Sequence, residues 1–228
     1  FGILDGFEHH EFMRGPHQAA YSYLKGELLR QEGKTDKAIS AWKKLYEGDD
    51  DLYRVRAGLA LTRLEQEEKD LPLKKAIDRL ERLRYAWRGD DLEAQVNYWL
   101  GRTYFDDAQY VKGLNIMRDA ASYATGVHLG QRIIEEMSEE FRNLYLGERL
   151  YKLSGPDVAA LYEHFAELVP SGEVGDLMGR RLADRLVQAN LYERAIEILS
   201  YQLENKLQGE DAYRVAVKLG VVHQLQGD

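Results

Sequence analysis

The chain has 228 residues but no cysteine and only four prolines. Without cysteine there is no disulfide framework, no thiolate metal site and no cysteine nucleophile. No stretch approaches the roughly 18 uncharged apolar residues that a membrane-spanning helix needs, so we expect no direct membrane insertion. Acidic residues outnumber basic ones by 39 to 31, which gives a net charge of −8. This balance argues against binding to a phosphate backbone, so no nucleic-acid partner is expected.

The distribution of the prolines and of the apolar residues predicts helices. Pro16, Pro72, Pro156 and Pro170 each fall where a helix should begin or end. Between these points apolar residues recur at i, i+3, i+4 and i+7, and no run of alternating β-branched residues is present. The sequence therefore predicts an all-α chain of about eleven helices with no sheet.

Pairs of small residues recur along the chain at one fixed separation. The pairs are Gly26/Ala38, Gly101/Gly113 and Ala183/Ala195, each twelve residues apart, and Gly220 follows Ala183 by 37 residues. Two antiparallel helices cross most closely where both carry Gly or Ala, because bulkier side chains would hold the axes beyond the usual ~8–10 Å. One such pair cannot bury its apolar face alone, so we expect the pairs to stack.

These segments resemble the tetratricopeptide repeat (TPR) family, and Trp99-Leu100-Gly101-Arg102-Thr103-Tyr104 is the strongest match. The resemblance implies a right-handed superhelix, an α-solenoid of about six antiparallel helix pairs. It would occupy residues 17–228, behind a short N-terminal segment of residues 1–16. Because the first residue is Phe and the last helical pattern stops abruptly, we interpret the sequence as a piece of a longer protein.

Two units depart from the family pattern. In residues 53–86 the small residues are Ala60 and Ala76, sixteen apart, so we expect a longer turn. In residues 127–169 we expect a long first helix and a turn at 153–156, with Ala159 or Ala160 as the small residue. The regularity of the superhelix should be lowest at these two units.

Residues that could carry out chemistry do not form a recognisable site. His9 and His10 lie near Glu8, Glu11 and His17, but adjacent histidine side chains diverge and no third ligand is fixed, so we expect no metal. The Asp pairs at 49–51, 90–91 and 106–107 fall at predicted helix starts and turns, where carboxylates cap free N–H groups. No phosphate-binding loop or nucleophile elbow is present. We predict no catalytic residues, no cofactor and no enzymatic activity.

The resemblance implies that a partner binds the concave face, which the first helix of each unit lines. With the small residue taken as position eight, the outward positions are two, five, nine and twelve. The partner-binding residues predicted in this way are Tyr23, Glu27, Arg30, Arg54, Gln95, Tyr98, Arg102, Phe105, Arg132, Glu135 and Arg142, with Leu61 and Glu139 as further candidates. Arginine and aromatic side chains are typical anchors for a protein or peptide segment. An ordinary hydrated surface is the alternative interpretation.

Three hypotheses about function remain open at this point. The first is a noncatalytic scaffold that holds a partner segment in its groove. The second is the noncatalytic superhelical region of a larger enzyme, for instance one that acts on cell-wall polymer. The third is a self-association module in which an exposed terminal helix pair docks onto another copy and forms a homodimer.

Overall fold

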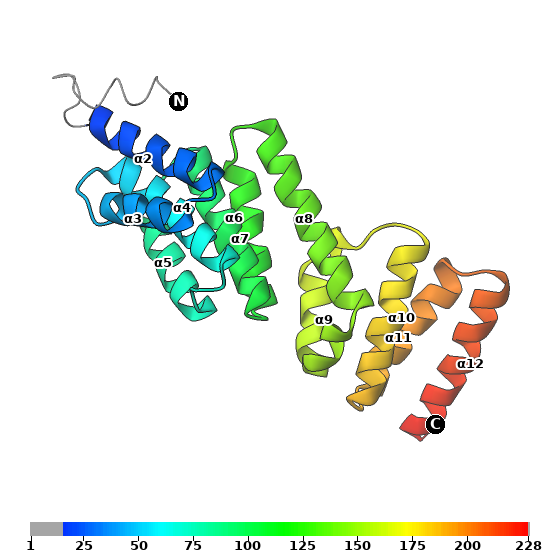
Figure 1. Cartoon of the computed structure of the whole chain (residues 1–228). Helices are drawn as coiled ribbons and strands as arrows, with labels where there is room; N and C mark the ends of the chain where they lie inside the picture. The colour runs from blue at the N-terminus through cyan, green and yellow to red at the C-terminus, as the bar shows by residue number, and fades with distance from the viewer. Residues whose placement is uncertain (1–15, 228) are drawn as a thin grey trace. The chain divides into compact units, whose positions relative to one another are not determined.

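The computed structural model describes residues 16–227 (Figure 1). Over these residues the chain forms eleven α-helices and two short 3₁₀ helices, and no strand. The predicted all-α fold and the number of helices are confirmed for the described part of the chain. The predicted N-terminal segment, residues 1–16, lies outside the described residues except for Pro16, where the first described helix begins.

The chain forms two compact units, Phe1–Ile134 and Glu135–Asp228. The helices of the first unit are α2 (Pro16–Gln31), α3 (Thr35–Tyr46), α4 (Asp51–Glu67), α5 (Leu73–Ala86), α6 (Asp91–Asp106) and α7 (Tyr110–Tyr123). The division falls within α8 (Val127–Leu146). The second unit continues with η1 (Glu148–Lys152), α9 (Gly155–His164), η2 (Ala166–Leu168), α10 (Glu173–Gln188), α11 (Tyr192–Asn205) and α12 (Gly209–Gln226).

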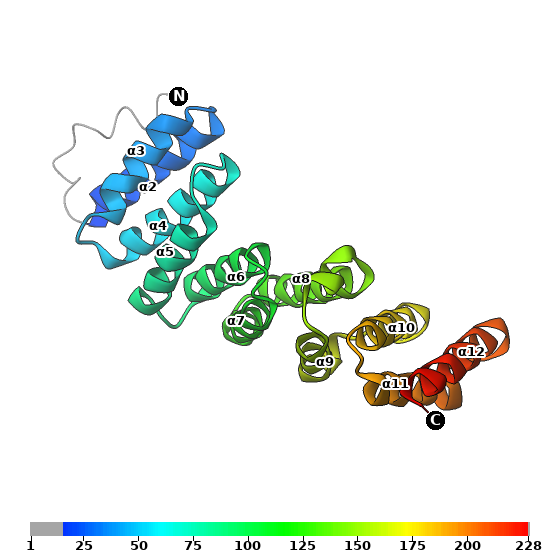
Figure 2. The same ribbon diagram turned by 90° about the horizontal axis from the view of Figure 1, so that it is seen from below.

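In the first unit, helices that follow one another in sequence pack as antiparallel neighbours (Figures 1 and 2). The pairs α2/α3, α4/α5 and α6/α7 each pack internally, and α3 packs on α4 as α5 packs on α6. Aliphatic side chains of α4, α5 and α6 form one continuous core between the second and third pairs, which includes Val55, Leu80, Leu83, Val96 and Leu100. Burial of this apolar surface stabilises the stack of helix pairs.

The small residues lie at the closest approaches within the pairs, as the repeat predicts. A Cβ added at Gly101 would overlap Met117 and lie 3.0 Å from the carbonyl oxygen of Gly113. A Cβ at Gly113 would lie 2.9 Å from the carbonyl oxygen of Gly101. A Cβ at Gly26 would lie 2.7 Å from Cδ1 of Trp42, a side chain that is fully buried. In these pairs a larger residue would force the helices apart.

The first helices of three helix pairs end in the same way. This shared ending identifies equivalent positions of the repeat independently of the small residues. Gly33, Ala108 and Asn190 have φ angles of +72°, +57° and +59°. Each lies seven residues after the small residue of its helix. The amide that follows each of them donates to a carbonyl five residues earlier, as in Lys34 N–H to Leu29 O at 2.8 Å. This is the Schellman ending of a helix.

The same ending corrects the predicted register of the second repeat unit, residues 53–86. Lys69 has a φ of +61°, and the Asp70 amide donates to the Glu65 carbonyl at 2.9 Å. Counting back seven residues places the small position at Thr62, which is fully buried, and not at Ala60. Thr62 and Ala76 are fourteen residues apart, so the turn is longer than in the other pairs by two residues. The prediction of a longer turn is confirmed, but the choice of Ala60 as the small position of this repeat unit was wrong.

The second compact unit contains the largest departure from the repeat. The first helix of the predicted fourth unit ends at Leu146, and the 3₁₀ helix η1 fills most of the chain up to Ser154, so the connection is longer than predicted. Ser154 caps α9 by accepting from the Asp157 amide at 3.2 Å. Phe141, Tyr145, Tyr162 and Phe165 cluster between α8 and α9. The Tyr145 hydroxyl donates to the Val158 carbonyl at 2.7 Å, so aromatic packing holds this pair together.

The close approach at Gly101 predicts the result of a substitution. Gly101→Leu should lower the free energy of unfolding by more than the ~1–3 kcal/mol that overpacking usually costs, because Met117 and the backbone of α7 both obstruct the side chain. Gly220 is the matched control, because it occupies the same repeat position in α12 and nothing lies within 4 Å of its added Cβ. In the monomer, Gly220→Leu should leave stability equal or raise it by up to about 1 kcal/mol through helix propensity. Urea unfolding measures both, and equal losses for the two variants would contradict the packing described here.

Candidate partner-binding face

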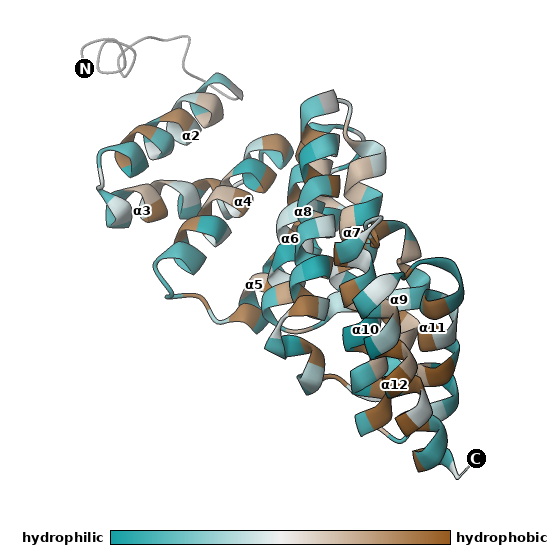
Figure 3. Ribbon diagram, turned by 90° about the vertical axis from the view of Figure 1, so that its right-hand side faces the viewer, coloured by the Kyte–Doolittle hydropathy of each residue, from teal (hydrophilic) through white to brown (hydrophobic). Residues whose placement is uncertain are grey.

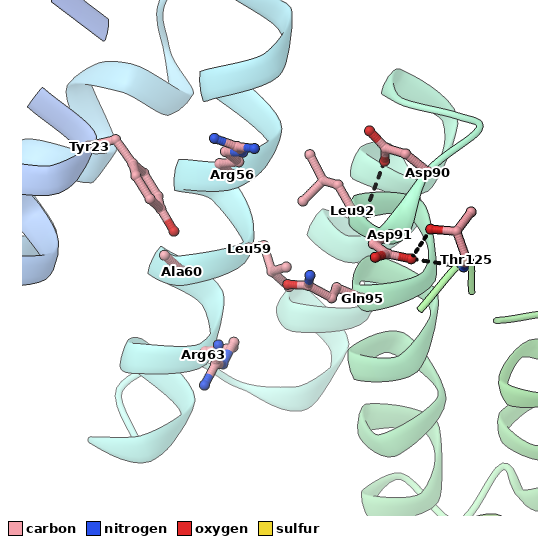
Figure 4. Close-up of a pocket in the computed structure, with 10 residues that line it drawn as sticks. All are labelled: Tyr23, Arg56, Leu59, Ala60, Arg63, Asp90, Asp91, Leu92, Gln95 and Thr125. Atoms are coloured by element: carbon pink, nitrogen blue, oxygen red, sulfur yellow. Dashed lines mark hydrogen bonds between the residues drawn. The ribbon is translucent and has the colours of Figure 1, made fainter. Parts of the chain in front are cut away.

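A hollow of about 390 Å³ opens between the first helices of the three helix pairs in the first unit (Figure 4). Tyr23 comes from α2, Arg56 and Arg63 from α4, and Gln95 from α6 (Figure 4). The remaining lining residues are Leu59, Ala60, Asp90, Asp91, Leu92 and Thr125. The first helices of successive helix pairs therefore supply one shared surface within the first compact unit.

Helical periodicity explains why these side chains share a face. Arg56 and Arg63 are seven residues apart on α4, as are Gln95 and Arg102 on α6. Seven residues make about two turns, so each pair lies on one side of its helix. With Thr62 and Gly101 as the anchors, these are positions two and nine of their units. The corrected register thus places Arg56 and Arg63 where the repeat predicts outward residues.

Beside this hollow, three arginines from α4, α6 and α8 gather on two aromatic rings; we call this set the arginine ladder. The Cζ of Arg63 lies 4.4 Å from the centre of the Trp99 ring, and the Cζ of Arg102 lies 5.2 Å from it. Arg102 and Arg132 lie 5.9 Å and 5.7 Å from the centre of the Tyr98 ring. The two rings meet edge to face at 5.4 Å. The negative ring faces attract the guanidinium groups.

Tyr23 links α2 to this face. Its hydroxyl donates to Glu27 Oε1 at 3.2 Å, and Arg30 Nε donates to the other carboxylate oxygen at 3.2 Å. Burial of the phenol, followed by the nearby Glu27 carboxylate, raises the pKa of Tyr23 to about 12. Glu27 and Arg30 are therefore partnered with each other on the same helix face.

The two aspartates of the hollow serve the backbone. Asp90 caps α6 and accepts from the Leu92 amide at 2.9 Å. Asp91 accepts from the hydroxyl and the amide of Thr125 at 2.8 Å and 2.9 Å (Figure 4). These hydrogen bonds lower the pKa of the Asp91 carboxyl below its usual value. The predicted capping role of the Asp pairs is confirmed at Asp90, and also at Asp50, which accepts from the Tyr53 amide.

The structure changes the predicted set of outward residues. Tyr98 and Phe105 are only 3% and 4% exposed, so the prediction that these rings point outward is wrong. Phe105 fills the space beside Gly113, and Tyr98 lies beneath Arg102 and Arg132. Glycine at positions 101 and 113 brings α6 and α7 so close that the Phe105 ring becomes enclosed. Gln95, Arg102 and Arg132 are exposed.

On α4 the predicted residues were two positions too early. Arg54 pairs with Asp51 at 2.5 Å in the first turn of the helix, and Leu61 is buried in the core. Arg56 and Arg63 take their places, about 200° further round the helix. The sequence offers several small residues on α4, and the signal that would have identified the right anchor is the helix ending at Lys69.

Two predicted residues belong to the second compact unit. Glu135 and Arg142 are exposed on α8, as is Glu139. Their part in partner binding stays a prediction.

No group of three or more His, Asp or Glu side chains between residues 16 and 227 could hold a metal ion. His9, His10, Glu8 and Glu11 lie outside the described residues, and His17 is exposed. Within the same range, every helix is too short or too polar to cross a bilayer.

Exposed apolar side chains follow one another along α12 in the second compact unit, a helix that carries several brown segments in Figure 3. Tyr213, Val217, Val221 and Leu225 are spaced four residues apart, and each is more than half exposed. Gly220 lies on the same side of the helix, with nothing within 4 Å of an added Cβ. At the equivalent position of α6, Gly101 meets the backbone of α7. Among the described residues, no helix packs against Gly220 in this way.

No protein-family model matches the sequence, and no curated protein sequence matches it. Among solved structures, the chain is similar to one described as the crystal structure of MamA protein, at 15% sequence identity and a TM-score of 0.47. The match covers 84% of this chain and 97% of that one. At this TM-score the likeness says nothing about partners or mechanism, and the TPR-like character of the fold stands on the helix pairs themselves.

The raised pKa of Tyr23 predicts how stability depends on pH. An unfolded tyrosine loses its proton near pH 10, whereas folded Tyr23 keeps it up to about pH 12. The unfolded state therefore binds fewer protons in this window, and stability that is present below pH 10 falls as the pH rises to 12. Tyr23→Phe should lose less stability than the parent between these pH values, measured as the urea midpoint. An identical loss in the two proteins would contradict the buried environment of the phenol.

Proposed function

We propose that this chain is a noncatalytic scaffold of the tetratricopeptide repeat type, which binds a protein or peptide segment on the face formed by α2, α4 and α6. The observation that carries the proposal is the arginine ladder beside a hollow of about 390 Å³. Exposed guanidinium groups over aromatic rings are typical of protein recognition, because they combine contact area with directional hydrogen bonds.

The chemistry of the face favours binding over catalysis. Its acidic residues are engaged by backbone amides or by neighbouring side chains, as Asp90, Asp91 and Glu27 are. General acid–base catalysis needs two titratable groups whose environments push their pKa values apart around a shared substrate. The hollow supplies no such pair of carboxylates, so we propose that the described region does not carry out a reaction.

A capture experiment tests the proposal. The chain with Arg63→Ala and Arg102→Ala should retain fewer protein partners from a cell extract than the parent, because two exposed anchors on the face are removed. The loss should be about tenfold for a partner that uses both.

The matched control changes two exposed cations on α5, a helix that contributes nothing to the hollow. Lys74→Ala with Arg82→Ala should retain the partners of the parent, although its net charge changes equally. Circular dichroism melting of both variants verifies folding. If the two double variants capture the same partners in the same amounts, the face has no binding role.

Self-association is a second candidate function, favoured by the apolar stripe on α12. Large exposed apolar patches mark interaction surfaces. A two-fold dimer needs a patch that complements itself. Two antiparallel α12 helices would satisfy this by crossing at Gly220, as α6 and α7 cross at Gly101 and Gly113. We propose a second copy of this chain as the occupant.

Sedimentation at several concentrations tests this candidate. The mean mass of the parent should rise with concentration, and Val221→Lys should hold the protein as a monomer, because a charge would be buried in the interface. Val111→Lys on α7, which changes another half-exposed valine, should associate like the parent. A monomer mass for the parent at every concentration would eliminate self-association.

A further inference from the structure

The first helices of the second compact unit repeat a contact that is made in the first. Positions are counted, as above, with the small residue of each first helix at position eight. Asp184, at position nine of α10, forms an ion pair with Lys218, at position six of α12. In the first compact unit Arg63, at position nine of α4, lies over the ring of Trp99, at position six of α6. Helices α10 and α12 are therefore neighbouring first helices of the repeat, as α4 and α6 are.

Three outward positions of α10 and α12 carry exposed aliphatic side chains. With Ala183 and Gly220 at position eight, Leu177 occupies position two of α10, and Val217 and Val221 occupy positions five and nine of α12. The three side chains are 41%, 52% and 51% exposed. In the first compact unit, positions two and nine of α4 and α6 carry arginine or glutamine. The same positions of the repeat thus present a different chemistry in the second compact unit.

The charged side chains at these outward positions are engaged within the protein. Asp184 is paired with Lys218 between the two helices, and Arg214 is paired with Glu210 along α12. Arg180, at position five of α10, has its Nη1 group enclosed by the protein. The surface of α10 and α12 that a ligand would meet is therefore mainly aliphatic.

The spacing of the exposed residues on α12 specifies the shape of the ligand. Tyr213, Val217, Val221 and Leu225 form one ridge with a step of four residues, and such ridges pack into the i±4 grooves of another helix. An extended chain would bring unpaired N–H and C=O groups onto this aliphatic surface, which costs free energy. A helix pairs these groups internally, so the ridge favours a helical ligand with an apolar side.

We propose that α10 and α12 form a second binding face, which takes an amphipathic helix with aliphatic residues one turn apart, and that self-association competes for this face. Helix α12 of a second copy is itself such a helix, so self-association covers Val217 and Val221. The inference rests on the proposed self-association and adds its regulation. A partner helix and a second copy exclude one another, so the partner shifts the protein toward the monomer by mass action.

A designed helical peptide tests binding and competition together. The probe is a fluorescein-labelled peptide of Leu, Glu and Lys, about five turns long, with a leucine at every third or fourth position, and its scrambled counterpart is the control. Fluorescence anisotropy should show that the probe binds about tenfold more tightly than the scrambled peptide. In sedimentation, saturating probe should lower the mean mass of the parent to that of a monomer with bound peptide. Equal affinity for the two peptides, or a bound probe that leaves the self-associated mass unchanged, would overturn the proposal.

Two variants locate the face. Leu177→Lys on α10 and Val221→Lys on α12 should each lower the affinity for the probe about tenfold, because each removes an aliphatic contact. The matched controls are Leu24→Lys on α2 and Val111→Lys on α7, which change side chains that are 54% and 50% exposed, and both should bind the probe like the parent. Circular dichroism melting verifies that all four variants fold. If Leu177→Lys also binds like the parent, the two helices do not share a face and the proposal fails.

The outcomes separate this inference from the proposed functions. If the parent self-associates but does not bind the probe, the second binding face fails and self-association stands. If the parent is a monomer at every concentration, self-association and the competition fail together, whatever the probe does. Capture through Arg63 and Arg102 on the first compact unit is decided independently of both results.

Discussion

The closest approach of paired helices, backbone against backbone, is the constraint on which the rest of the structure depends. At Gly101 and Gly113 a Cβ on either helix would meet the carbonyl oxygen of the other within 3.0 Å. This contact sets the distance between α6 and α7, and therefore which neighbouring side chains become enclosed. Phe105 is buried because its ring packs beside Gly113 of α7, and Arg102, one residue after Gly101, is exposed.

The proposed partner-binding face follows from the same constraint. When second helices occupy one side of each first helix, the other sides of α2, α4 and α6 are left to form a shared surface in the first unit. Side chains two turns apart on each helix then recur along that surface, which gathers Arg63, Arg102 and Arg132 over the rings of Trp99 and Tyr98. Positive charge accumulates on this surface because the repeat places equivalent positions of successive helices side by side.

Much of the fold could be predicted from the sequence, because small residues, apolar periodicity and proline positions are local signals. The register of the second repeat unit could not be predicted in this way. Helix α4 carries Ala57, Gly58 and Ala60, but the small position of the repeat is occupied by Thr62, which is not among the smallest residues. That error moved the expected site from Arg56 and Arg63 to Arg54 and Leu61. Burial of Tyr98 and Phe105 was missed because the groups that lie against these rings, Arg132 of α8 and Gly113 of α7, come from other helices.

A double-mutant cycle between Gly101→Ala and Met117→Ala tests the central constraint most directly. The added methyl at Gly101 overlaps the Met117 side chain, and the shortened residue 117 frees the space that this methyl needs. The combined variant should therefore be more stable than the sum of the two single losses predicts, by about 1 kcal/mol. If the two losses add within about 0.3 kcal/mol, the Met117 side chain does not pack against the backbone of residue 101, and the account of this crossing is contradicted.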